Sequence, residues 1–244
     1  MADRVPSAHD LALAEAAAQA ASHIYYCLPH NGEWVPEGMP SAMLPSKRYQ
    51  VPWPLNRSSF LNHSFNMYWC DALNKNPRPK FWAMHHADMS AEPGWLDVLL
   101  DIMAEKDADV VSCIARIKDD SGDTNAAIVT KLDDHGTDLR RLTVAEANSL
   151  PDVFSSADVN APLLVNTGMW VVRFDRPWVE KFPGFSFNNA IVKNKAGLYV
   201  PQCLSEDWKF SLWAHEMKLK VYATTRVETF HYGTRAWKVG GARV

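Results

Sequence analysis

The sequence predicts an α/β protein whose mostly parallel sheet is covered by helices. Within residues 23–114, segments rich in β-branched and aromatic residues alternate with segments whose apolar residues recur at helical spacing. Strands that alternate with helices in this way are typical of parallel sheets. The 244-residue chain is 47% hydrophobic and 22% charged, as expected of a globular protein with a sizeable core. We therefore expect a single domain over residues 1–244.

The elements expected in the first half follow from composition and period. Six prolines between residues 29 and 54 favour a long loop there, and long loops in compact domains are often functional. Around it we expect three helices, over residues 8–22 at the surface, 56–73, and 92–106 with an amphipathic pattern. We expect three strands, over residues 23–28, 80–84 and 108–114, of which the last is buried.

The second half has a different pattern. The turn residues at 133–136 predict a hairpin, Gly168 interrupts an apolar strand, and Ser205 is suited to cap a helix. Residues 182–200 have no regular pattern. We expect the hairpin over residues 126–132 and 138–144, and the interrupted strand over 163–172. We expect the helix over residues 205–217 and two short strands over 219–223 and 227–230.

Charge and composition restrict the classes of function. The net charge of −3 gives no general attraction for a polyanion. The N-terminal segment lacks the pattern of a signal peptide, and no stretch reaches the ~18 apolar residues of a membrane span. We therefore expect a cytoplasmic protein. The four cysteines have no zinc-type spacing and predict buried free thiols, at Cys27, Cys70, Cys113 and Cys203.

The run KFWAMHHAD at residues 80–88 carries the strongest functional signal. An apolar strand stops at His85, His86 and Asp88, and polar groups at the end of a buried strand cost free energy unless they bind something. In open α/β sheets, ligands bind beyond the carboxyl ends of strands. We therefore expect chemistry here. Because His85 alternates with His86 along the strand, we expect His85 to face away and to be structural.

Three segments give this run a family context. They are FWAMHHADMSAEPGWLDVLLDIMAEKDADVVS at residues 81–112, VNTGMWVVR at 165–173 and LSEDWKFSLWAHEMKLKVYATTRVETFHYG at 204–233. In this order and spacing they resemble the GT-A glycosyltransferases, especially family-2-like enzymes. The resemblance implies a Rossmann-like mixed sheet flanked by helices. It also implies that residues 23–115 form the half that binds the nucleotide sugar. Residues 116–235 would form the half that binds the acceptor and carries the catalytic residues, and residues 236–244 would be a tail.

The first segment resembles the strand that ends in the family's Asp-x-Asp motif. The last Asp of that motif binds Mn²⁺ or Mg²⁺, and the matching residue is Asp88. His231 matches a histidine that completes the metal site in many members. A hard cation prefers oxygen ligands and offsets charge on a leaving diphosphate. His86 departs from the pattern, since the family usually has Asp there; imidazole could still hydrogen-bond a ribose or ligate a metal.

The third segment resembles the family's Glu-Asp helix, which faces the acceptor. The resemblance implies that Asp207, with Glu206 beside it, is the general base that deprotonates the acceptor hydroxyl in an inverting reaction. The second segment would line the same site with Asn166, Thr167 and Gly168.

The resemblance also implies where the donor binds. The end of the first strand would receive the nucleobase at Pro29, His30 and Asn31, and Arg57 matches a basic residue near the diphosphate or base. Ala87 would lie at the donor within the motif. The implied donor is a nucleotide sugar, with UDP-sugar favoured. The acceptor stays open among glycans, other hydroxyl compounds and a modified DNA base.

A different enzyme class also fits part of the pattern. His86, Asp88 and His231 spell a two-His-one-carboxylate triad, and Arg243 could mimic the 2-oxoglutarate-binding arginine of Fe(II) oxygenases. Those enzymes use a jelly roll, whereas residues 56–114 predict helices alternating with strands. A non-catalytic nucleotide-sugar-binding module is a third interpretation.

Simpler roles remain for the same residues. Asp88 could only cap the next helix, and Glu206 with Asp207 could only complement a helix dipole. A basic face is a further hypothesis, which would join Lys47, Arg48, Arg140, Arg141 and the tail at residues 235–243.

Overall fold

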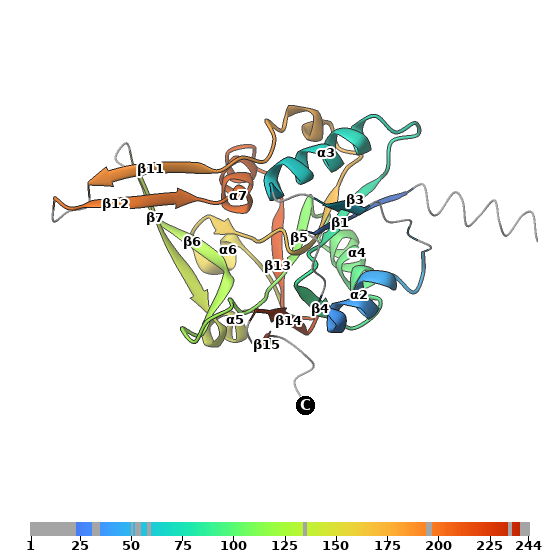
Figure 1. Ribbon diagram of the computed structural model, residues 1–244, viewed down its shortest axis with the longest axis horizontal. Helices are drawn as coiled ribbons and strands as arrows, with labels where there is room; N and C mark the ends of the chain where they lie inside the picture. The colour runs from blue at the N-terminus through green and yellow to red at the C-terminus, as the bar shows by residue number, and fades with distance from the viewer. Residues whose placement is uncertain are drawn as a thin grey trace, which may run out of the picture.

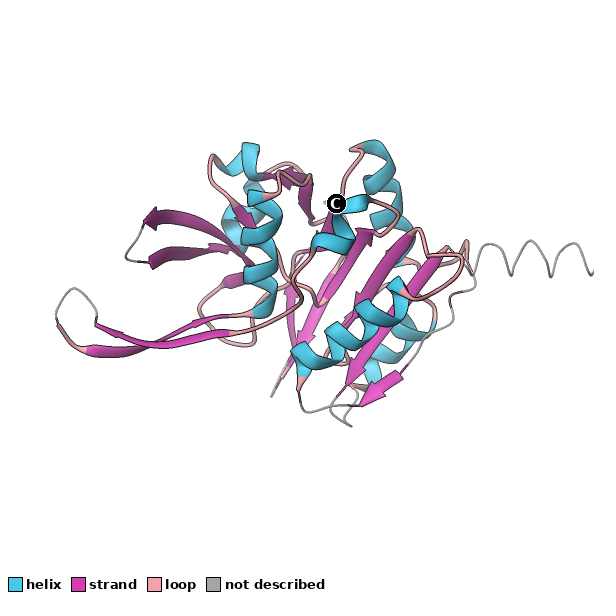
Figure 2. Ribbon diagram, turned by 90° about the horizontal axis from the view of Figure 1, so that it is seen from above, coloured by secondary structure: helices cyan, strands magenta, loops and turns pink. Residues whose placement is uncertain are grey.

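A seven-stranded mixed sheet with helices on both faces forms the body of the protein (Figures 1 and 2). The computed structural model describes residues 23–30, 35–49, 51, 55–57, 60–133, 136–193, 197–233 and 236–239. The strand order is β2-β1-β3-β10-β5-β13-β8. The predicted α/β class, with a mixed sheet flanked by helices, is confirmed.

The elements of the body are short. The strands of the central sheet are β1 (Ile24–His30), β2 (Leu55–Arg57), β3 (Phe81–His85), β5 (Val110–Cys113), β8 (Val153–Ser155), β10 (Met169–Arg173) and β13 (Val221–Thr224). The helices are α2 (Met39–Met43), α3 (Leu61–Leu73), α4 (Trp95–Glu105), α5 (Val144–Ser149), α6 (Ser156–Val159) and α7 (Glu206–Glu216), with 3₁₀ turns at Pro36–Gly38 and Pro177–Lys181.

Three smaller sheets surround the central one. They are β4 (Met89–Ala91) with β14 (Thr229–Tyr232) and β15 (Ala236–Val239), β6 (Asp123–Asp133) with β7 (Gly136–Thr143) and β9 (Leu163–Leu164), and β11 (Asn188–Lys193) with β12 (Tyr199–Leu204). The β6–β7 and β11–β12 hairpins project from the same side of the body in both views (Figures 1 and 2).

Strand direction gathers three chain segments at one edge of the sheet. β1 pairs in parallel with β2 and β3, so the segments that follow β1 and β3 leave the sheet at the same edge. β10 runs antiparallel between β3 and β5, and its first residue, Met169, lies opposite His85, the last residue of β3. The residues just before β10 therefore meet the residues just after β3.

Alternation along the strands divides the apolar side chains between two cores. Trp82 and Trp170 face the first core with α3 and α7, and their rings meet edge to face with centroids 5.7 Å apart. Ala83 and Val171 face the second core with α4. The helix residues that fill these cores include Phe65, Tyr68, Trp69 and Phe210 in the first and Trp95, Leu96, Leu99 and Met103 in the second.

Three expectations about the first half are wrong in detail. The helix predicted from residue 56 begins at Leu61, and Leu55–Arg57 instead forms β2 along the edge of β1. A free strand edge offers backbone hydrogen bonds that outweigh a local helical pattern. The helix predicted from residue 92 begins at Trp95 after Gly94, whose φ of 90° is left-handed. Residues 29–54, expected as a loop, include α2.

Two further differences concern strands without an apolar pattern. Residues 182–200, expected to be irregular, contain β11 and the start of β12, whose side chains are mostly exposed. Exposure on both faces removes the alternation on which a strand prediction depends. The short strand β4 follows Asp88, between the predicted strand at 80–84 and the predicted helix at 92–106, where no element was expected. The hairpin predicted near residues 126–144 is confirmed and is longer, as β6 and β7.

The cysteines, the apolar helices and the N-terminal segment were also the subject of predictions. The cysteines are free, but Cys70 and Cys203 are exposed, so the expectation of buried thiols holds only for Cys27 and Cys113. Within the described ranges, no helix has the length and apolar character that crossing a membrane requires. The helix expected at residues 8–22 lies outside the described residues.

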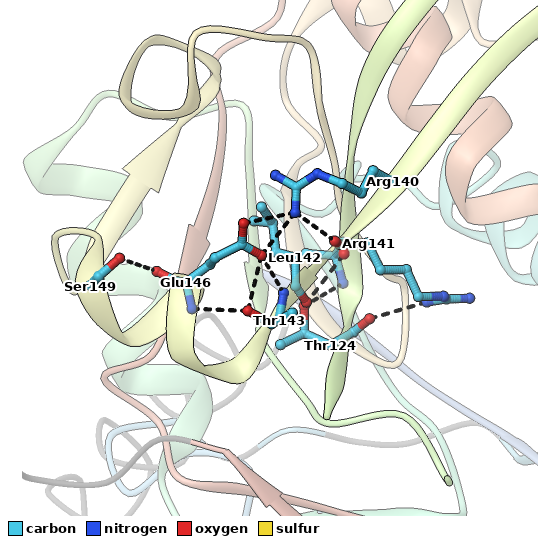
Figure 3. Close-up of polar contacts among 8 residues, drawn as sticks. Thr124, Arg140, Arg141, Leu142, Thr143, Glu146 and Ser149 are labelled. Carbon is cyan, nitrogen blue, oxygen red and sulfur yellow. Dashed lines mark hydrogen bonds and ion pairs between the residues drawn. The ribbon is translucent and has the colours of Figure 1, made fainter. Parts of the chain in front are cut away.

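Thr143 and Glu146 close the start of α5 (Figure 3). The Glu146 N–H donates to Thr143 Oγ1 at 3.1 Å, and the Thr143 N–H donates to Glu146 Oε2 at 2.8 Å. We expect Thr143→Ala to lower the free energy of unfolding by about 1 kcal/mol, because a helix N–H loses its acceptor. Urea denaturation measures this change. Ser149→Ala is the control, since that exposed hydroxyl donates only to a carbonyl of its own helix. Equal losses would contradict a capping contribution.

Candidate active site

His231 lies beside Asp88 because β14 pairs with β4. In this ladder His231 is opposite Met89, and the Tyr232 N–H donates to the Asp88 carbonyl at 2.8 Å. His231 Nε2 is then 3.7 Å from Asp88 Oδ2. The two residues that the sequence predicted as metal ligands are thus brought together, although 143 positions separate them in the chain.

The surroundings of His231 fix how its ring is used. Nδ1 lies 3.1 Å from the Arg116 carbonyl, which only accepts hydrogen bonds. Nδ1 therefore carries a proton and donates it to this carbonyl, which turns Nε2 toward Asp88. A histidine oriented by a backbone carbonyl in this way is typical of metal sites.

Asp88 is surrounded by the side chains of two histidines and a lysine and remains ionised. Burial by itself would raise the pKa of the Asp88 carboxyl, but contacts with His231, His86 and Lys118 outweigh burial and hold that pKa below its ordinary range. Lys118 Nζ donates directly to Asp88 Oδ2. The Asp88 carboxylate is therefore ionised at neutral pH, at the edge of the sheet.

The two histidines of the motif face opposite sides. His85 is fully buried, its Nε2 lies 3.0 Å from Ser41 Oγ, and burial lowers its pKa to about 3. His86 packs on the Phe65 ring, and its Nε2 lies 3.2 Å from Met84 Sδ. Burial lowers the pKa of His86 to about 4, so its ring is neutral near pH 7. The structural role expected of His85 agrees with these contacts.

A chain of hydrogen bonds joins the motif to the carboxylate pair of α7. The His86 N–H donates to the Gly168 carbonyl, the Gly168 N–H donates to Asn166 Oδ1, and Asn166 Nδ2 donates to Asp207 Oδ2, each at 2.7 Å. A Cβ on Gly168 would lie 2.3 Å from Met89 Sδ and 2.6 Å from Asn166 Oδ1, so a side chain at this position would displace both side chains. Thr167, between them, is buried, and its hydroxyl has no hydrogen-bond partner among the described residues.

Asp207 is buried and held by several donors. Oδ1 accepts from Ser205 Oγ and, at 2.8 Å, from the Trp208 N–H, while Oδ2 accepts from Asn166. Burial raises the pKa of Asp207, and these donors oppose the rise. Burial, and then the charge of Asp207, raise the pKa of neighbouring Glu206 to about 7. Two adjacent carboxylates in different surroundings are typical of acid–base sites.

Glu206 makes the stability of the fold depend on pH. Because the folded protein holds this proton more tightly than the unfolded chain, the stability it contributes is complete below about pH 4.5 and is lost as the pH rises through about 7. Gln resembles the uncharged carboxyl, so Glu206→Gln should gain about 3 kcal/mol over wild type at pH 8 and almost nothing at pH 4.5. Urea unfolding at both pH values tests this.

Glu216→Gln is the matched control for that experiment, because it removes an exposed carboxyl from the end of the same helix. It should change the stability by similar, small amounts at both pH values. A gain for Glu206→Gln that is independent of pH would contradict the assigned pKa.

The end of β1 brings together part of the predicted nucleobase site. Pro29 and His30 are the last residues of β1, and Arg57 lies opposite His30 in the parallel β1–β2 pairing. Arg57 was expected to open a helix; it lies instead in a strand, because the edge of β1 supplies backbone partners. Asn31 lies outside the described residues.

Asp88 and His231 by themselves are too few ligands to hold a metal ion. Within the described part of the chain, no group of three or more His, Cys, Asp or Glu residues could hold a metal ion. Mg²⁺, however, is commonly bound by one or two carboxylates together with phosphate oxygens and water. Asp88 would supply one such carboxylate, and His231 Nε2 lies 3.7 Å from it.

Arg140 and Arg141 contact different partners. Arg140 donates to Glu146 Oε1 at 2.7 Å, whereas the Arg141 guanidinium lies 4.6 Å from the Trp208 ring and donates to the Thr124 carbonyl at 3.2 Å (Figure 3). Arg141 therefore adjoins the residue after Asp207. Sequence reasoning missed this contact and that of Lys118 with Asp88, because both depend on tertiary packing of irregular or exposed segments.

Comparisons with known proteins support the fold. No protein-family model and no curated protein matches the chain. The solved structure of A197 from STIV is similar, with a TM-score of 0.53 at 12% identity over 91% of this chain and 97% of that one. A proposed UDP-N-acetylglucosamine pyrophosphorylase from Entamoeba histolytica gives a TM-score of 0.36 at 10% identity over 85% and 74% of the chains, which carries no argument.

Proposed function

We propose that this protein is a glycosyltransferase of the GT-A, family-2-like type that moves a sugar from a nucleotide-diphosphate sugar to an acceptor hydroxyl. One observation carries the proposal. Hydrogen bonds lead from the backbone N–H of His86 through Gly168 and Asn166 to the buried carboxylate of Asp207. Asp88, two residues after His86, lies 3.7 Å from His231 Nε2 at the other end of this path. Sugar transfer from such a donor needs both functions, a place for the diphosphate and a base for the acceptor.

The Asp88 end is the diphosphate end in this proposal. Mn²⁺ or Mg²⁺ held by Asp88 and His231 would offset the charge that develops on the leaving diphosphate. His86 and Ala87 would contact the donor beside it, and His30 with Arg57 would lie toward the nucleotide. We infer a UDP-sugar as donor from the resemblance described above.

Asp207 is the base in this proposal. Its carboxylate takes the proton of the acceptor hydroxyl as the acceptor oxygen bonds to the anomeric carbon, and the bond from that carbon to the diphosphate oxygen breaks. Asn166, Ser205 and the Trp208 N–H fix the orientation of the carboxylate. Attack from the side opposite the leaving group inverts the anomeric configuration. The acceptor is a glycan or another hydroxyl compound, and a modified DNA base belongs to that class.

No observation favours the oxygenase alternative. The described residues form a mixed sheet with helices on both faces rather than a jelly roll, and His86 Nε2 contacts the Met84 sulfur. Arg243, which that alternative requires, lies outside the described residues.

A thermal-shift screen of nucleotide sugars, with and without Mn²⁺, tests the proposed function. We expect a UDP-sugar to raise the melting temperature more with Mn²⁺ than without it, and the Mn²⁺-dependent part to disappear in Asp88→Asn. NMR of the product should show the inverted anomer. A retained anomer would reject the base mechanism, and turnover of 2-oxoglutarate with Fe²⁺, without nucleotide binding, would reject the proposal as a whole.

A further inference from the structure

Lys118 reaches Asp88 from an ordered segment. It follows β5, where the Ile117 N–H donates to the Asp123 carbonyl at 3.1 Å and Arg116 forms a β-bridge with Thr124. The same segment supplies the Arg116 carbonyl that orients His231. The Lys118 side chain is 34% exposed, so its ammonium group lies at the surface of the site, within reach of solvent and ligands.

The ammonium group occupies the Asp88 oxygen that lies nearest to His231. Lys118 Nζ donates to Asp88 Oδ2, the carboxylate oxygen that His231 Nε2 approaches at 3.7 Å. A divalent cation between Asp88 and His231 would lie beside this ammonium group, and two cations on one oxygen repel each other. Lys118 and a divalent cation are therefore alternative partners of Asp88.

We propose that Lys118 is a ligand of the donor diphosphate, and that it holds Asp88 until a divalent cation takes its place. This inference rests on the proposed function. Lysine is a compact charge on a flexible stem, suited to leave a carboxylate for a nearby phosphate. The cation displaces Lys118 from Asp88, and the diphosphate receives it. Metal and diphosphate consequently bind cooperatively, because each removes an obstacle to the other.

Calorimetric titration of Mn²⁺ and of UDP into wild type and Lys118→Met separates these effects. Without nucleotide, the variant should bind Mn²⁺ about tenfold more tightly, because the competing cation is gone. With Mn²⁺ present, it should bind UDP about tenfold more weakly, because a phosphate ligand is gone. The factor by which UDP strengthens Mn²⁺ binding should fall accordingly. Water-proton relaxation by Mn²⁺ gives an independent measure of bound metal.

Lys220→Met is the matched control, because Lys220 Nζ also contacts an aspartate, Asp107, at 2.8 Å, but on the exposed surface. It should change neither affinity. If wild type binds UDP and Lys118→Met leaves both affinities unchanged, the role of Lys118 is rejected while the proposed function stands. If wild type binds no nucleoside diphosphate at any Mn²⁺ concentration, the proposed function and the diphosphate role fail together.

Discussion

Asp207→Asn is expected to lower the turnover number for sugar transfer by about 10²- to 10⁴-fold, the usual contribution of a general base. The amide keeps the volume of the carboxylate and can still accept at one oxygen from Trp208 N–H, but it cannot take the acceptor proton. Donor affinity should change little, because Asp207 lies at the acceptor end of the hydrogen-bond path from His86. Steady-state kinetics with a UDP-sugar, together with calorimetric donor binding, measure the two quantities.

Glu206→Gln is the matched control for that variant, since it alters the adjacent carboxyl on the same helix turn. It should reduce turnover far less than Asp207→Asn and mainly alter the pH profile near neutrality, where Glu206 titrates with a pKa of about 7. Wild-type turnover in Asp207→Asn would reject the base assignment. If instead Glu206→Gln abolished turnover and Asp207→Asn did not, the base would be Glu206.

Trp170→Ala is expected to lower the free energy of unfolding by about 3–5 kcal/mol. Trp170 is fully buried, and its ring packs edge to face on Phe210 and Trp82, with centroids 4.8 and 5.7 Å away. Truncation would leave a cavity between β10, α3 and α7 that these rigid rings cannot fill. Because domains are stable by only about 5–15 kcal/mol, much of the folding free energy would be lost. Urea denaturation followed by far-UV circular dichroism measures it.

Trp170→Phe provides the control for aromatic packing. It keeps a ring in the cluster and removes an indole N–H that has no hydrogen-bond partner within the described residues. We expect it to cost about 1–2 kcal/mol, well below the alanine variant. Equal losses for the two variants would contradict the cavity explanation.

Periodicity and strand ends were enough to predict the α/β class and most elements of the central sheet. The alternation of apolar residues set His85 and His86 on opposite faces, and the contacts with Ser41 and Phe65 agree. The structure also brings His231 to Asp88, as the resemblance implied, and places Asn166 against Asp207, a contact that was not predicted. Whether these contacts perform sugar transfer stays a prediction.

The remaining features depend on partners distant in the sequence. β4 is three residues long, Met89–Ala91, and exists because β14 supplies its backbone hydrogen bonds. This pairing brings His231 to Asp88, and no local feature of the sequence predicts it. Arg57 lies in an edge strand, Arg141 packs on the Trp208 ring, and Lys118 lies in a segment packed against Asp88. None of these positions can be predicted from the sequence around the residue.

The antiparallel strand β10 has a consequence for the order in which the protein can fold during synthesis. Met169–Arg173 stands between β3 and β5, so the first 115 residues cannot form a continuous sheet by themselves. The sheet formed by residues 23–115 therefore stays in two separated pieces until β10 has emerged from the ribosome, and β13 joins the sheet later still. Chain synthesis thus delays both halves of the site until the same late stage, and the nascent chain must keep the apolar faces of β3 and β5 from other partners in the meantime.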